Sequence, residues 1–142
     1  MRPRILIVDD SGDFVEYSRR RLAARGMTVL TAADGEAALG IYDREVVDVV
    51  LLDILMPGMD GIETLRELKK RDPHVQVVML TGHGTQETLS QGESLGATEL
   101  LLKPAELDTV LAAIDRAVER RGARGADAAA RTELEATKDD GT

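Results

Sequence analysis

The chain has 142 residues, a formal net charge of −8 and no cysteine, and its length suits a single domain. The absence of cysteine excludes disulfides, thiolate metal sites and a cysteine nucleophile, and it fits a cytoplasmic protein. The negative charge and the 2% aromatic content argue against direct nucleic-acid binding, and no apolar run is long enough for membrane insertion.

Short apolar runs that predict buried strands alternate with segments that have helical periodicity. In chain order the sequence predicts a strand at Ile5 to Val8, a helix at Gly12 to Arg25, a strand at Met27 to Thr31, a helix at Gly35 to Glu45, a strand at Val46 to Leu52, a helix with Ile62, Leu65 and Leu68 on one face, a strand at Val75 to Leu80, a helix at Thr85 to Leu95, a strand at Glu99 to Leu102, and a helix whose apolar face runs from Leu107 to Val118. Asp60 is placed to cap the third helix.

Five strand–helix repeats predict an α/β fold with a five-stranded parallel sheet, right-handed crossovers and helices on both faces. With the strand order 2-1-3-4-5, ligands are expected at the carboxyl ends of the strands. After Arg121 the sequence turns to small and charged residues. We therefore expect a domain over residues 1–121 and a disordered tail over residues 122–142.

Three carboxylates follow strands that this order makes neighbours. Asp9 and Asp10 follow the first strand, and Asp53 follows the third. Without compensation they would repel one another and raise the pKa of at least one, and a bound divalent cation relieves that repulsion. Hard oxygen ligands with no histidine or cysteine nearby favour Mg²⁺, or Mn²⁺, over zinc.

A hydroxyl and an ammonium group are expected at the same edge of the sheet, because Thr81 and Lys103 follow the fourth and fifth strands. Taken singly, each of these residues is more often a turn residue, a helix cap or a solvated charge. Together, a metal, a lysine and a hydroxyl around a carboxylate meet the needs of phosphoryl transfer. The carboxylate can act as the nucleophile and form an aspartyl phosphate.

Four motifs stand in a specific order and spacing: ILIVDD at residues 5–10, VVLLDILMPGMDG at 49–61, VVMLTGHG at 77–84 and LLLKP at 100–104. Through them the chain resembles the receiver domains of two-component response regulators, including the single-domain chemotaxis type. The resemblance extends from Arg4 to Arg121. It implies a flavodoxin-like, three-layer fold and a signalling role as a phosphoacceptor.

The resemblance also implies roles for the polar residues of the motifs. Asp53 would accept a phosphoryl group from a histidine kinase or a phosphotransfer protein. Asp9 and Asp10 would hold Mg²⁺, with Asp10 the more direct ligand and Asp9 acting partly through water. Thr81 would hydrogen-bond the phosphoryl group, and Lys103 would pair with it.

Four further positions match the same pattern. Leu55 would complete the metal site with its backbone carbonyl, and Gly82 would leave room for the phosphoryl group. The peptide bond that precedes Pro104 would be cis and would help to aim the lysine inward. His83 and Leu55 would flank the path of the water that hydrolyses the aspartyl phosphate.

Leu100 departs from the family pattern. The family usually has Tyr or Phe three residues before the lysine, and that ring turns inward on activation. Leucine takes no part in the phosphorylation chemistry, but it cannot act as an aromatic switch. Leu100 is then either an apolar anchor for a partner, which is the role we expect, or part of the core.

These observations predict a stand-alone receiver that signals through altered binding to a downstream protein. It would promote its own phosphorylation and slow autodephosphorylation without being a turnover enzyme. One alternative is a Mg²⁺-dependent phosphatase, which would need an Asp two residues after Asp53, where Leu55 stands. Another is a flavodoxin-like nucleotide-binding module, but the acidic DDSGD segment replaces the expected phosphate loop.

Overall fold

The structure is a computed structural model and describes residues 3–54, 60–82, 86–103 and 105–121. The strands are β1 (Arg4–Val8), β2 (Thr28–Ala32), β3 (Val49–Asp53), β4 (Val77–Thr81) and β5 (Glu99–Leu102). The helices are α1 (Gly12–Ala24), α2 (Gly35–Arg44), α3 (Gly61–Arg71) and α4 (Gln86–Ser94), and residues 107–121 are also helical. The predicted tail, residues 122–142, lies outside the described residues.

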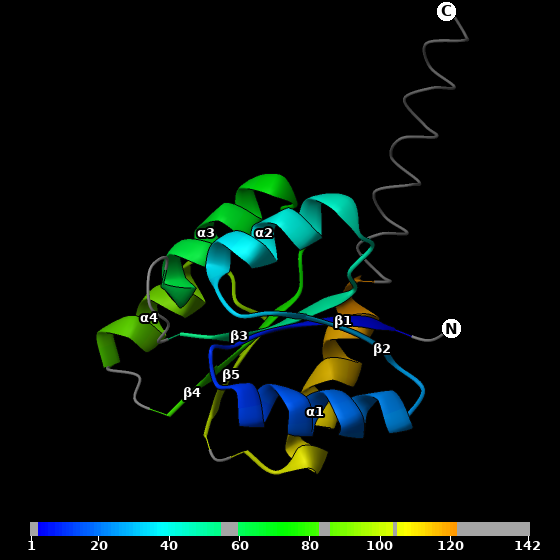
Figure 1. The fold of residues 1–142 in the computed structure, drawn as a ribbon. Coiled ribbons are helices and arrows are strands. Elements are labelled where there is room, and N and C mark those ends of the chain that lie inside the picture. The colour runs from blue at the N-terminus through cyan, green and yellow to red at the C-terminus, as the bar shows by residue number, and fades with distance from the viewer. Residues whose placement is uncertain (1–2, 55–59, 83–85, 104, 122–142) are drawn as a thin grey trace, which may run out of the picture.

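The sheet has five parallel strands in the order β2-β1-β3-β4-β5, which confirms the predicted topology (Figure 1). The largest difference from the predicted strands is the start of β3. The strand begins at Val49, whereas the prediction began it at Val46. Val46 is 67% exposed and lies before the strand.

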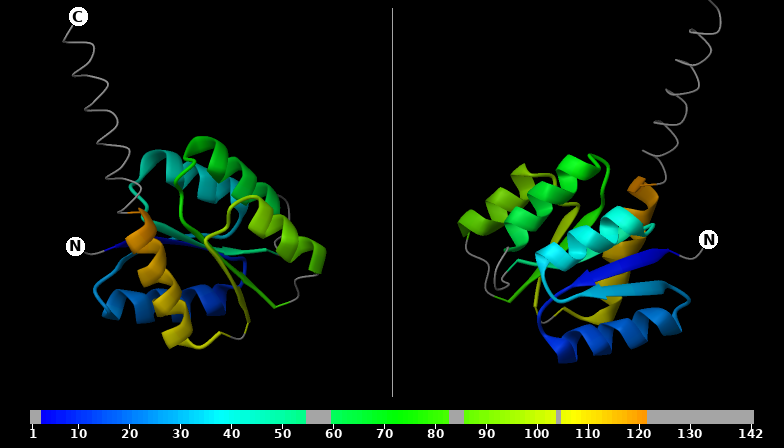
Figure 2. Two further views of the ribbon diagram at one scale, coloured as in Figure 1. Left: turned by 180° about the vertical axis from the view of Figure 1, so that it is seen from behind. Right: turned by 45° about the horizontal axis from the view of Figure 1, so that its top comes forward.

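Helices cover the sheet on both faces. The helix α1 and the helix over residues 107–121 lie on one face, and α2, α3 and α4 lie on the other (Figures 1 and 2). Each face has its own hydrophobic cluster. Along β1, Ile5 and Ile7 join the cluster with α1, whereas Leu6 and Val8 join the other, because side chains of a strand alternate between faces.

Burial depends on the place of each strand in the sheet. The strands β3 and β4 are buried throughout, and β1 is buried after its first residue. The edge strands are more open: Thr28 and Thr31 of β2 are exposed, and Leu102 of β5 is 64% exposed. The edge strands nevertheless contribute to the clusters of both faces, through Val29 and Leu30 of β2 and Leu100 and Leu101 of β5, so the expected cover on both faces is present.

Aspartate side chains fix the starts of two helices. The carboxylate of Asp34 accepts the N–H of Ala37 at 2.8 Å, and that of Asp60 accepts the N–H of Glu63 at 2.8 Å. Each bond satisfies a helix N–H group that has no partner within the helix. The cap predicted for Asp60 is confirmed.

Gly61 allows the start of α3 to lie directly against the end of β3. Its N–H group donates to the carbonyl oxygen of Ile54 at 2.8 Å. A Cβ atom at this position would collide with the carbonyl oxygen of Asp53 and would stand 2.5 Å from the Cα of Ile54. Only glycine fits this close backbone approach, which supports the strand end that carries Asp53.

A polar network joins several elements at the amino end of the sheet. Asp72, at the end of α3, accepts hydrogen bonds from the Tyr42 hydroxyl at 2.6 Å and from the Arg121 guanidinium at 3.0 Å. Arg121 also lies 3.9 Å from Asp48, and Asp48 accepts the N–H of Arg4 at 2.7 Å. The network ties the helix over residues 107–121 to α2, α3 and β1.

Burial by itself raises the pKa of Asp72. The hydrogen bonds from Tyr42, Arg121 and the backbone of His74 outweigh that effect, so the pKa lies below its usual value. Burial and the bond to Asp72 raise the pKa of Tyr42, which therefore remains a donor at physiological pH.

Among the described helices, none combines the length and the apolar character that crossing a bilayer requires.

Replacing Asp72 should weaken the network. Asp72→Asn is expected to lower the free energy of unfolding at pH 7 by about 1–3 kcal/mol, since two donors lose a charged acceptor. Folding lowers the pKa of Asp72, so its carboxylate stabilises the fold above its unfolded pKa, and that contribution disappears as the pH falls through the folded pKa. The variant should therefore show a flatter decline of stability in acid, measured by urea unfolding at several pH values.

The control for this experiment is Asp43→Asn, which removes an exposed carboxylate 3.0 Å from Arg71. Its effect is expected to stay within about 0.5 kcal/mol, because exposed ion pairs contribute little. Equal losses in the two variants would contradict the importance of the network.

Two glycine substitutions should act in opposite directions. Gly61→Ala is expected to destabilise the fold by about 1–3 kcal/mol, because the added methyl group forces α3 away from β3. Gly40→Ala, inside α2, should stabilise it by about 0.5–1 kcal/mol, because the new Cβ would lie 3.8 Å from the nearest atom, a nitrogen of Arg44. Chemical unfolding of the two variants tests this contrast. Changes of the same sign in the free energy of unfolding of both variants would contradict it.

Candidate functional site

The carboxyl ends of four strands bring five predicted residues to one edge of the sheet. Asp9 and Asp10 follow β1, Asp53 ends β3, Thr81 ends β4 and Lys103 follows β5. One carboxylate oxygen of each aspartate lies within 4.8 Å of those of the other two. The predicted convergence of the three acids is therefore present in the structure.

The three carboxylates differ in their exposure. Asp9 is 3% exposed and Asp53 is 8% exposed, whereas Asp10 faces solvent. Burial of two like charges beside each other costs free energy unless nearby cations or donors offset it. The site therefore requires positive charge.

Lys103 supplies one positive charge. Its Nζ lies 2.6 Å from Oδ2 of Asp9 and 3.7 Å from Oδ2 of Asp53. The backbone N–H of Lys103 donates to the carbonyl oxygen of Thr81 at 2.7 Å, which holds the lysine beside the end of β4. In the part of the chain that the structure describes, three carboxylates converge beside this ammonium, so a further cation would be stabilised there.

Both oxygens of Asp9 accept hydrogen bonds from the protein. Oδ1 accepts the N–H of Ser11 at 2.9 Å, and Oδ2 accepts from Lys103. Since Ser11 is the N-cap residue of α1, Asp9 also fixes the turn from β1 into that helix. The exposed carboxylate of Asp10 is the more accessible of the pair for a ligand.

This set of donors fits a hard divalent cation. The group that the described residues bring together consists of carboxylates alone, and carboxylate oxygens are preferred ligands of Mg²⁺ and Mn²⁺. A divalent ion would supply the positive charge that a cluster of carboxylates favours. Zinc sites in proteins are instead built largely from histidine and cysteine.

Other predicted site residues are placed as follows. Thr81 is buried at the end of β4, and Gly82, which follows it, is exposed. Among the described residues, the nearest atom to a Cβ on Gly82 would be the Cβ of Lys103 at 3.9 Å, an ordinary contact. Leu55, His83 and Pro104 lie outside the described residues, and their roles stay predictions.

Leu100 is half-buried beneath α4. It packs against the hydrophobic cluster of that face, and its Cδ2 lies 3.4 Å from the position that a Cβ of Gly92 would take. Together with Leu89 and Leu102 it also lines a groove of about 330 Å³ between α4 and β5. This placement supports core packing, and a role as a partner anchor stays a prediction.

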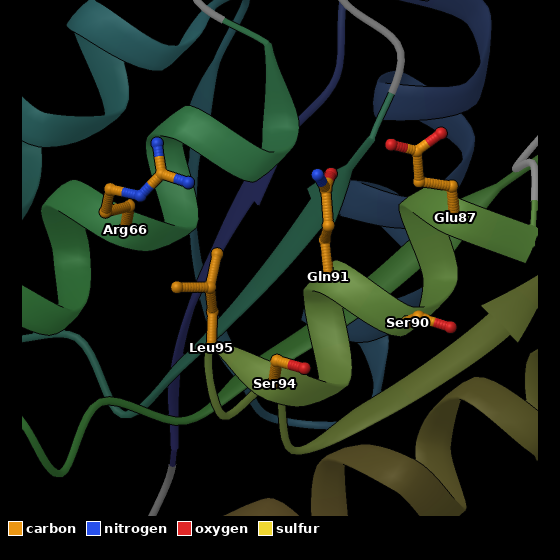
Figure 3. A pocket seen from close by; sticks show the side chains of 6 residues that line it. All are labelled: Arg66, Glu87, Ser90, Gln91, Ser94 and Leu95. Atoms are coloured by element: carbon orange, nitrogen blue, oxygen red, sulfur yellow. The ribbon is translucent and has the colours of Figure 1, made fainter.

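The size of a cavity does not identify the chemical site. A groove of about 460 Å³ lies between α3 and α4 (Figure 3). Its lining side chains are Arg66, Glu87, Ser90, Gln91, Ser94 and Leu95. None of the five converging residues belongs to this groove. Convergence of charge, and not volume, marks the site at the sheet edge.

The sequence reasoning missed one residue at the site, Phe14. The ammonium of Lys103 lies over its ring, 4.3 Å from the ring centroid. Phe14 is the third residue of α1, and the lysine follows β5, far from it in the sequence. Only the tertiary structure joins them, although the chain's single phenylalanine so close to the acidic motif was a signal worth following.

Comparisons with known proteins agree with this geometry. The family described as the response regulator receiver domain matches residues 5–115. Sporulation initiation phosphotransferase F of Bacillus subtilis is 34% identical over 116 residues, which cover 82% of this chain and 94% of that protein. The response regulator PleD of Caulobacter vibrioides is 40% identical over 123 residues, which cover 84% of this chain and 27% of that protein.

Solved structures show the same fold. A CheY-like receiver domain protein from Methanospirillum hungatei has a TM-score of 0.84 at 27% identity, covering 87% of this chain and 99% of that one. Chemotaxis protein CheY4 of Vibrio cholerae has a TM-score of 0.78 at 31% identity, covering 82% of this chain and 99% of that one.

Several curated relatives are much longer than this chain. It spans 46% of the probable transcriptional regulator ycf27 of Guillardia theta and 24% of the regulator NtrC of Salmonella typhimurium. Receiver domains generally bind Mg²⁺ at an acidic pocket, and they interact with histidine kinases or phosphotransfer proteins. By the extent of the family match and by its fold, the chain belongs to the receiver domains of two-component response regulators, which are phosphoacceptor signalling domains and not classical enzymes.

Proposed function

We propose that this chain accepts a phosphoryl group on Asp53 from a phosphohistidine of a histidine kinase or a phosphotransfer protein. The observation that carries the proposal is the setting of the Asp53 carboxylate. It is nearly buried at the end of β3, clustered with two other carboxylates and 3.7 Å from the ammonium of Lys103. Such an arrangement suits a nucleophile whose product carries more negative charge than the reactant.

In the proposed transfer, an oxygen of Asp53 attacks phosphorus while the phosphorus–nitrogen bond of the donor breaks. The donor imidazole keeps the electron pair of that bond. Lys103 can donate hydrogen bonds to the phosphoryl oxygens, because its ammonium already lies between Asp9 and Asp53. The hydroxyl of Thr81, from the adjacent strand, is assigned to the same phosphoryl group.

Asp9, Asp10 and Asp53 are the proposed carboxylate ligands of Mg²⁺, together with the backbone carbonyl of Leu55. When bound, the cation would neutralise charge on the transferred group and on the carboxylates. Because both oxygens of Asp9 already accept hydrogen bonds, Asp10 is the better direct ligand, and Asp9 acts partly through water.

The proposed output is altered affinity for a protein partner. A phosphoryl group adds about two negative charges, and it can reorganise the residues that follow β4. With leucine at position 100, an aromatic side-chain switch takes no part in this change.

We place the protein in the cytoplasm, where ATP-dependent kinases operate. We also assign it slow autodephosphorylation, whose rate would depend on Leu55 and His83 beside the path of the hydrolytic water.

The substitution Asp53→Asn tests the proposed nucleophile. The wild-type chain, incubated with acetyl phosphate and Mg²⁺, should gain one phosphoryl group as a base-labile adduct, detected by intact mass. The variant should form none, because an amide is a poor nucleophile at oxygen. Asp34→Asn is the control, since asparagine preserves the N-cap of α2, and it should be phosphorylated normally. An unchanged adduct in Asp53→Asn would contradict the proposal, and steady turnover of unrelated phosphomonoesters would favour the phosphatase alternative.

Asp10→Asn tests the cation site. Millimolar Mg²⁺ should raise the Tm of the wild-type chain, because a ligand that binds the folded state stabilises it. Loss of the Asp10 charge should weaken binding at least about tenfold, measured by calorimetry and by the shift in Tm. Asp13→Asn removes an exposed charge outside the cluster and should change the affinity by no more than about twofold. Equal weakening in both variants would indicate a diffuse electrostatic effect instead of a site.

A further inference from the structure

The ring of Phe14 supports the ammonium of Lys103 at the acidic edge. The ammonium nitrogen lies 4.3 Å from the ring centroid, within the range of a favourable cation–π contact. The ring itself is half-buried and packs against the hydrophobic cluster that includes Leu22 and Ile114. A ring anchored in this way offers a fixed surface to the lysine.

Lys103 needs such a surface. Its side chain has four rotatable bonds, and a flexible stem would otherwise let the ammonium move into solvent. Here the side chain is only 22% exposed. The ammonium nitrogen lies 2.6 Å from Asp9, 3.7 Å from Asp53 and 4.3 Å from the centroid of the ring beneath it. The ring therefore restricts the ammonium to the space between the two carboxylates.

The ring and the carboxylate that receives the lysine also share one support. Oδ1 of Asp9 accepts the N–H of Ser11, and the carbonyl of Ser11 accepts the N–H of Val15 at 3.0 Å in the first turn of α1. Phe14 belongs to that turn. Asp9 thus fixes the start of the helix that carries the ring, while its other oxygen holds the lysine.

We propose that Phe14 is a positioning residue for Lys103. The ring holds the ammonium where phosphoryl transfer to Asp53 develops negative charge, and it touches no reacting atom itself. The inference rests on the proposed function, because it assumes that Lys103 contacts the phosphoryl group.

The chain contains a single phenylalanine, so ring-fluorinated phenylalanine supplied during expression changes position 14 alone. Fluorine atoms withdraw electrons and so reduce the negative electrostatic potential over the ring face, while they nearly preserve the shape of the ring. The rate of adduct formation from acetyl phosphate should fall stepwise with the number of fluorine atoms. The most fluorinated form should be about three- to fivefold slower than the unmodified protein.

The same trend measured in a Lys103→Met background separates positioning from packing. Without the ammonium, fluorination should change the residual rate by less than about twofold, since the cation–π contact is gone. A merely structural role for the ring would give the same trend in both backgrounds, and that result would overturn the inference.

A spectroscopic measurement needs no phosphoryl donor. The ε-methylene protons of Lys103 should resonate upfield of ordinary lysine signals, because they lie near the face of a ring. Phe14→Tyr should keep this shift, and Phe14→Leu should remove it. Tyr17→Leu is the matched control, since it removes a ring of α1 that lies under Arg21, 4.8 Å from its guanidinium carbon. It should leave the lysine signals and the rate unchanged.

These measurements separate the two proposals. A wild-type chain that forms no adduct on Asp53 overturns the proposed function, while the lysine signals still report whether the ring holds the ammonium. Lysine signals at ordinary positions in the wild-type chain overturn the positioning role even where the adduct forms. The fluorinated forms keep the test valid if Phe14→Leu does not fold.

Discussion

Two carboxylates buried side by side impose the main constraint on this molecule. Asp9 and Asp53 lie at the end of an apolar sheet, where water cannot screen their repulsion. The ammonium of Lys103 and the N–H group of Ser11 offset part of this repulsion, and the cluster is suited to a divalent cation that would offset more of it. The acids meet because parallel strands end at the same edge of the sheet, where Asp9 and Asp10 follow β1 and Asp53 ends β3.

The elements around the site mainly hold the functional side chains in place, and they add few reactive groups of their own. Gly61 lets α3 lie against the backbone that carries Asp53, and the Asp60 cap fixes where that helix begins. Asp9 has two tasks at once, since it receives the lysine and also sets the turn into α1. A residue with both a structural and an electrostatic task cannot be changed without affecting each of them.

Much of this arrangement could be predicted from the sequence. Continuous apolar runs identified the strands, and their alternation with helices predicted a parallel sheet, because both depend on local patterns and on general rules of connection. The convergence of Asp9, Asp10 and Asp53 then followed from the strand order 2-1-3-4-5, which makes the first and third strands neighbours. The start of β3 at Val49 did not, since an apolar run does not show where strand pairing begins. Phe14 under Lys103, and the network around Asp72, join segments distant in sequence through packing alone, which no local pattern encodes.

The contact between Gly92 and Leu100 makes the sizes of two positions depend on each other. A Cβ at Gly92 would meet Met79 at 3.1 Å and Leu100 at 3.4 Å, so α4 lies as close to β5 as these side chains allow. For protein engineering, transplanting an aromatic switch into this receiver is therefore a design problem involving the helix above it as well as the strand. A larger side chain at position 100 would therefore also have to be accommodated at Met79 or in the position of α4.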